Sequence, residues 1–187
     1  MPTSQSNIKR ARDVLSTPMS MAFISLIGKA IVVGAVTGFL VSIFRWIIDH
    51  TLKGLMVIYP TMAHHPQLLI PYIAATILII FILSKILKSS LLDLVGSGVP
   101  QIEAILLNEH KMNAWSVLWR KFVGGLLAIC PGLFLGREGP CIQMGACIGQ
   151  LFGEKLNISE KEKRFLLECG VAAGLSAAFS APLAGVI

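Results

Sequence analysis

Three short turns in this 187-residue chain combine small residues with a proline. Proline is favoured as the first residue of a helix, because its missing N–H would have no intrahelical partner there in any case. Each turn therefore predicts a helix start, whose unpaired amides and dipole of about half a positive charge attract anions. The turns are Gly96-Ser97-Gly98-Val99-Pro100, Gly136-Arg137-Glu138-Gly139-Pro140 and Ser180-Ala181-Pro182.

Glu138 is the most informative residue of the second turn, because it is an ionisable group between two uncharged stretches. A charge at membrane depth is costly, so such a residue is a candidate for function. At an amide-rich helix start, its carboxylate would compete with a dissolved anion. Once displaced, it would favour its protonated form, although the helix dipole opposes this. Anion passage would then be coupled to proton transfer. The alternative is that Glu138 pairs with Arg137 or Lys121 for structure alone.

Ser97 supplies a hydroxyl that can donate a hydrogen bond to an anion. A serine between two glycines also suggests an intramembrane serine protease, which would need a base within hydrogen-bond reach. The four histidines lie in connections or at segment ends, and the apolar part after Lys111 has none. A purely structural membrane subunit is a third possibility.

The amino-acid composition indicates that lipid, and not water, surrounds most of the chain that carries these turns. Hydrophobic residues make up 55% of the chain and charged residues only 14%, against about 25% charged in soluble domains. With a mean hydropathy of +0.75, the chain cannot be a soluble enzyme, a coiled coil or a disordered tail. The 16 basic residues are scattered and form no aromatic-interleaved stripe, so no nucleic acid partner is expected. The four cysteines lack paired spacing, so neither a metal site nor a cofactor is predicted.

Two apolar stretches, Met19–Ile48 and Leu68–Leu87, are long enough to cross a bilayer. A short connection over residues 50–67 joins them. Three basic residues precede the first stretch, one lies in the connection and five follow between Lys85 and Lys121. This asymmetry places the N-terminal segment, residues 1–18, in the cytoplasm, with the chain crossing outward and returning.

The three later apolar segments, residues 122–136, 139–153 and 169–187, are interrupted by glycine and proline. The first two would be only about 22 Å long, short of a hydrocarbon core of about 30 Å. Short, interrupted segments indicate broken or re-entrant helices around an internal polar site. The charged stretch before the last segment predicts a solvated loop that opens a helix at Ser159.

Three fragments of the chain together resemble the CLC family of chloride channels and chloride/proton exchangers. They are GSGVPQIEAIL, GREGPCIQMGACIG and GLSAAFSAPLAGVI, in the family's order and with similar separation. The resemblance implies an all-α membrane homodimer with one pore per subunit. Each subunit would consist of two inverted halves of tilted, partly broken helices in the lipid bilayer.

By this resemblance, Ser97 would coordinate a central chloride, and Glu138 would act as the gating and proton-transfer residue. The anion site would also include Gly96, Gly98, Gly136, Arg137, Glu138 and Gly139. The resemblance also implies that a serine at position 97 favours chloride over nitrate. The implied activity is chloride/proton antiport, with a voltage-gated-type chloride channel of the same family as the alternative.

We expect residues 19–187 to form a multi-pass transmembrane anion-transport domain, in the plasma membrane, truncated after roughly the first half. The internal proton-transfer glutamate of many exchangers would lie beyond Ile187, which leaves channel against exchanger open. Glu103 and Lys121 also lie in the matched region. They could line an inner route or form a structural ion pair.

Overall fold

The structure, a computed structural model, describes residues 21–88, 91–156 and 158–185. Every regular element in these ranges is helical, which confirms the predicted all-α class. The N-terminal segment 1–18 lies outside the described residues. The elements are α2 (Met21–His64), η1 (Pro66–Leu68), α3 (Leu69–Leu87), α4 (Leu91–Leu94), α5 (Val99–Leu106), α6 (Ala114–Ile129), α7 (Glu138–Lys155), α8 (Glu160–Phe179) and η3 (Pro182–Gly185).

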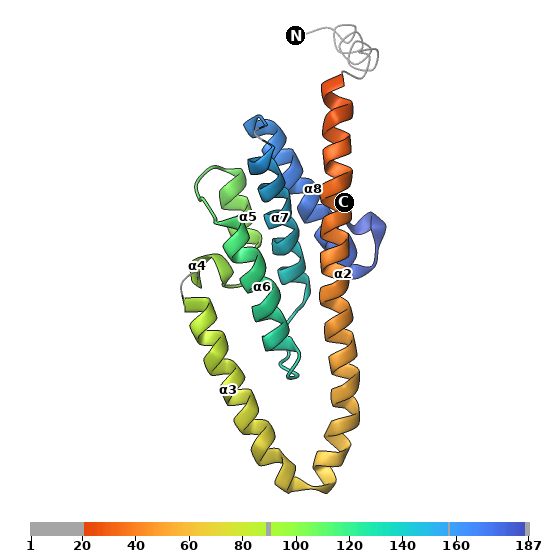
Figure 1. The fold of residues 1–187 in the computed structure, drawn as a ribbon, viewed down its shortest axis with the longest axis vertical. Coiled ribbons are helices and arrows are strands. Elements are labelled where there is room, and N and C mark those ends of the chain that lie inside the picture. The colour runs from red at the N-terminus through yellow and green to blue at the C-terminus, as the bar shows by residue number, and fades with distance from the viewer. Residues whose placement is uncertain (1–20, 89–90, 157, 186–187) are drawn as a thin grey trace, which may run out of the picture.

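Helices α2 and α3 form two long arms that meet at one end of the molecule (Figure 1). By length and composition, Phe23–Met62 and Leu69–Leu87 can each cross a membrane. The predicted connection over residues 50–67 was wrong, because α2 remains helical through Pro60 to His64. Pro60 removes one intrahelical hydrogen bond. The loss of that one bond does not end α2, which continues for four more residues.

Helix α3 has no buried residue, although it consists almost entirely of apolar side chains. Ile70, Ile77 and Phe81 are each more than 60% exposed. In water this surface would be unfavourable, because apolar area costs free energy wherever it remains hydrated. Lipid is the solvent that this helix fits.

Helices α6, α7 and α8 pack between the two arms (Figure 1). The axes of α7 and α8 approach closely through glycines spaced four residues apart. A Cβ atom on Gly145 would overlap the carbonyl oxygen of Gly170, and one on Gly174 would lie 2.5 Å from the carbonyl oxygen of Cys141. This is the small-residue packing typical of helices in membranes.

Local capping determines where α6 and α8 begin. The Asn113 side chain accepts a hydrogen bond from the amide of Ser116 at 3.1 Å. Ser159 and Glu162 form a reciprocal capping box, which confirms the predicted helix start at Ser159. The charged stretch and the first part of the last apolar segment therefore form one helix, α8, which ends at Phe179.

Candidate functional site

The first glycine turn leads into α5 through two residues of left-handed backbone. Gly96 and Gly98 have φ values of +77° and +84°, which side chains disfavour. Gly98 is the N-cap of α5, and Pro100 is the second residue of the helix. The predicted helix start is therefore confirmed at this turn.

The second turn leads into α7, which begins at Glu138. Pro140 is the third residue of the helix and not the first, as the sequence pattern had suggested. It still lies in the first turn, where the backbone amides have no intrahelical partner. The amides of Glu138 and Gly139 belong to the same unpaired set.

The third turn does not join the other two. Ser180 ends α8 with a φ of +53°, and Pro182 is the first residue of η3. Both residues line a shallow groove between α8 and α2, together with Gly34 and Gly38. Two of the three predicted helix starts thus remain for one site.

The first two turns are in direct backbone contact. A Cβ atom on Gly139 would lie 2.8 Å from the Cα of Ser97 and 3.0 Å from its carbonyl oxygen. An open cavity of about 510 Å³ lies between the turns, next to the C-terminal half of α6. Of the predicted site residues, it is lined by Gly96, Ser97, Gly136, Glu138 and Gly139.

Glu138 is partly exposed in this cavity. Among the described residues, none forms an ion pair or hydrogen bond with its carboxylate. Arg137, which does not line the cavity, pairs instead with Asp49 of α2, at 2.6 Å between Nη1 and Oδ1. The alternative that Glu138 is held by Arg137 or Lys121 is therefore wrong.

Lys121 of α6 is buried beneath the first turn. Its ammonium donates to the carbonyl oxygens of Leu94 at 2.8 Å and Gly96 at 3.1 Å. Glu103 is exposed on α5, and no ion pair joins it to Lys121 in the part of the chain that the structure describes. The hypothesis of a Glu103–Lys121 pair was wrong, because backbone carbonyls take the lysine's donors.

Gln143 is a residue of this site that the sequence reasoning missed. Its side chain is fully buried, and its Nε2 donates to the carbonyl oxygen of Asp93 at 2.6 Å. A Cβ atom on Gly98 would lie 2.6 Å from the Gln143 Cδ, so only glycine fits against it. An amide in the largely apolar first half of α7, five residues after Glu138, was the available signal.

Helix α2 holds the start of α7 and the end of α8 through one pair of side chains. Arg45 donates to the carbonyl oxygen of Ala177 and to the hydroxyl of Ser180. Asp49, one turn further along α2, holds Arg137. A cation at the C-terminal end of α8 is also favourable for the helix dipole.

The Ser97 hydroxyl is exposed and accepts a hydrogen bond from the Val99 amide at 3.4 Å. Its own hydrogen therefore remains able to donate to an anion in the cavity. The lining residues that the structure describes include no histidine. The base that the serine-protease interpretation needs is thus not among them.

Two curated relatives are similar in sequence to this chain. The H⁺/Cl⁻ exchange transporter ClcA of Salmonella schwarzengrund is 35% identical over 96% of this chain and 37% of its own length. The transporter of the same name from Vibrio parahaemolyticus is 44% identical over 49% of this chain and 20% of its own length. The chain therefore spans less than two fifths of the length of these relatives.

A solved structure supports the fold independently. A slow cyanobacterial Cl⁻/H⁺ antiporter matches with a TM-score of 0.77 and 35% identity, over 86% of this chain and 38% of its own. Residues 76–187 match the family model described as voltage gated chloride channel, and this range includes both turns of the cavity. The chain therefore belongs to the voltage-gated chloride channel family.

Proposed function

We propose that the protein carrying this sequence moves chloride across a membrane in exchange for protons. The observation that carries the proposal is the shared cavity of Ser97 and Glu138, formed where the starts of α5 and α7 touch. The names of the relatives, which are chloride/proton exchangers, agree with it.

Chloride would be held by donors and not by a fixed positive charge. The first-turn amides of α5 and α7 have no intrahelical partner, and both helix dipoles favour an anion there. The Ser97 hydroxyl adds one more donor, while the buried Lys121 ammonium lies behind the Gly96 carbonyl. Donors that are already in place stabilise an ion without reorganisation.

Glu138 would act as the gate and as the proton carrier. Its carboxylate has no partner among the described residues, so leaving its position breaks no ion pair. As the first residue of α7, it is attracted to the same amides as chloride. Because two anions cannot share these donors, chloride entry displaces the carboxylate, which then takes up a proton.

The proposed setting is a multi-pass protein of the plasma membrane, with a cytoplasmic N-terminus and two copies per assembly. The basic residues before α2 favour this orientation. The uncovered apolar surfaces of α2 and α3 fit lipid. Chloride and protons are the proposed substrates, and the proposed mechanism uses neither a metal nor a cofactor.

Glu138→Gln tests the mechanism, because glutamine keeps the shape of the side chain and cannot carry a proton. In reconstituted vesicles, an imposed chloride gradient should move protons with the wild-type protein and none with the variant. Chloride flux itself should persist or increase. Glu168→Gln, on an exposed part of α8, is the matched control and should keep proton movement.

The same measurement decides between exchanger and channel. A voltage-gated-type chloride channel is the second candidate, favoured by the description of the matched family. A wild-type protein that passes chloride while no protons move would establish the channel. Proton movement that survives Glu138→Gln would instead remove Glu138 from the mechanism.

A further inference from the structure

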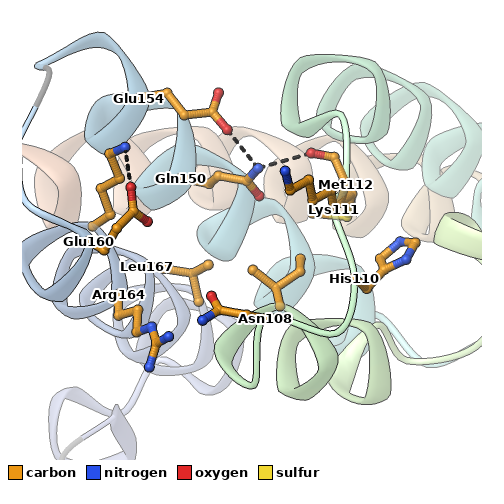
Figure 2. Close-up of a pocket in the computed structure, with 11 residues that line it drawn as sticks. Asn108, His110, Lys111, Met112, Gln150, Glu154, Glu160, Arg164 and Leu167 are labelled. Atoms are coloured by element: carbon orange, nitrogen blue, oxygen red, sulfur yellow. Dashed lines mark hydrogen bonds and ion pairs between the residues drawn. The ribbon is translucent and has the colours of Figure 1, made fainter.

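A second cavity, of about 360 Å³, lies at the other end of α7 (Figure 2). The end of α5, the loop at residues 107–113, the last turns of α7 and the first two turns of α8 line it. It shares no lining residue with the Ser97–Glu138 cavity. The proposed chloride pathway does not use it.

Cations outnumber acids around this cavity, and the acids are already engaged. Lys163 donates to Glu160 at 2.7 Å, and the Gln150 side-chain amide donates to Glu154 at 2.8 Å. Lys111 and Arg164 also line the cavity. Within the described residues, neither of these two cations has a hydrogen-bond or ion-pair partner.

The charges of the cavity's cations also act on the carboxyl of Glu160. The pKa of its carboxyl is lowered, first by the hydrogen bond and charge of Lys163 and further by the charges of Arg164 and Lys111. An anion near the same point would feel the same positive potential. The cavity therefore favours a negatively charged ligand.

Gln150 contributes an uncharged polar side chain to the lining of the cavity. Its Nε2 donates to the carbonyl oxygen of Met112 at 2.9 Å as well as to Glu154. Its Oε1 is buried and has no partner among the described residues. In Figure 2, Gln150 lies beside Lys111, whereas Arg164 lies farther away, beyond Leu167. A buried acceptor without a donor is unfavourable by about 1–3 kcal/mol, so a ligand with a hydroxyl would fit here.

The cavity lies beside a surface typical of the membrane–water interface. Trp115 is 65% exposed and Trp119 is 41% exposed, both in the first two turns of α6. Trp115 and Lys111 line one shared groove. Tryptophan is enriched at the depth of lipid head groups, and basic pockets there bind anionic head groups.

We propose that this cavity binds a phosphate group that carries a hydroxyl, as in a glycerophosphate. Lys111 and Arg164 hold the phosphate oxygens, and the hydroxyl donates to the Gln150 Oε1. The same chemistry occurs in the phosphatidylglycerol head group and in free sn-glycerol 3-phosphate. The neighbouring tryptophans favour the lipid.

Binding can be measured without transport, so this proposal and the proposed function can fail separately. The purified protein is titrated in detergent with phosphatidylglycerol, phosphatidylcholine or sn-glycerol 3-phosphate, and the thermal midpoint is recorded. We expect a shift with phosphatidylglycerol and little with phosphatidylcholine, which has no net charge and no free hydroxyl. Binding of sn-glycerol 3-phosphate alone would support the site and assign it a soluble ligand.

Variants locate the site. Lys111→Gln and Arg164→Gln should each weaken phosphatidylglycerol binding about tenfold, the usual cost of losing one charged hydrogen bond. Lys161→Gln is the matched control, because Lys161 lies in the same first turn of α8 but does not line the cavity. Equal affinities in wild type, Lys111→Gln and Arg164→Gln would overturn the proposal, as would the absence of binding by all three probes.

Two further variants have effects that misfolding cannot imitate. Glu160→Gln removes the carboxylate that competes for the cations, so it should strengthen binding. Gln150→Leu should reduce the preference for phosphatidylglycerol over phosphatidylcholine. A weaker affinity in Glu160→Gln, or an unchanged preference in Gln150→Leu, would contradict the arrangement.

Discussion

Replacing Gly139 by alanine tests how the two turns of the anion cavity meet. The new Cβ would lie 2.8 Å from the Cα of Ser97, whereas ordinary contacts begin at 3.4 Å, so the turns must separate by about 0.6 Å. Both partners are backbone atoms, and no side-chain rotation can relieve the contact. Displacements of about 1 Å in a site can cost about 10²-fold in rate, so we expect chloride flux to fall at least about tenfold.

The assay is chloride efflux from vesicles, and Gly54→Ala on α2 provides its control. A Cβ on Gly54 would meet nothing within 4 Å, and Gly54 does not line the anion cavity. Gly54→Ala should therefore keep the chloride flux close to wild type. A wild-type flux in Gly139→Ala, or equal losses in both variants, would refute the reasoning.

Three other predictions concern the surrounding structure. Gln143→Leu leaves the Asp93 carbonyl without its donor, at a cost of about 1–3 kcal/mol, so a chloride titration should show a raised KM. Gly145→Val should prevent α7 from packing on α8, seen as loss of monodisperse protein, whereas Gly54→Val faces open space and should not. The hydrogen bond from Ser159 lowers the pKa of Glu162. The capping box therefore stabilises α8 fully above the ordinary carboxyl pKa of 4.5, and this contribution is lost as pH falls through the lowered value. Amide exchange at the start of α8 should accelerate in acid, with a smaller pH effect in a Glu162→Gln variant.

Features that depend on neighbouring residues in the chain could be predicted from the sequence. Gly98 caps the start of α5 and Ser159 caps the start of α8, because backbone freedom and capping are local properties. The extent of α2 could not be predicted in this way. Whether a helix continues past Pro60 depends on a balance between one lost hydrogen bond and the packing of the next turn, and the pattern of residues does not give that balance.

In the candidate site, too, features that depend on chain neighbours could be predicted, and features that depend on tertiary contacts could not. The residue types of Ser97 and Glu138, and the turns that carry them, indicate an anion site from the sequence alone. The partners of Lys121 are carbonyl oxygens 25 and 27 positions earlier in the chain. Gln143 bonds a backbone oxygen 50 positions away. Such contacts arise from tertiary packing, and residue spacing does not encode them.

The length of α2 has a geometric consequence. Its apolar run of 40 residues measures about 60 Å, twice the thickness of a hydrocarbon layer of about 30 Å. A rod of that length fits only if it slants by about 60° from the membrane normal or leaves one end in water. On such a slant, Arg45 and Asp49 would sit near mid-depth, where an unmatched charge is hardest to tolerate. Both are matched, one by the end of α8 and the other by Arg137.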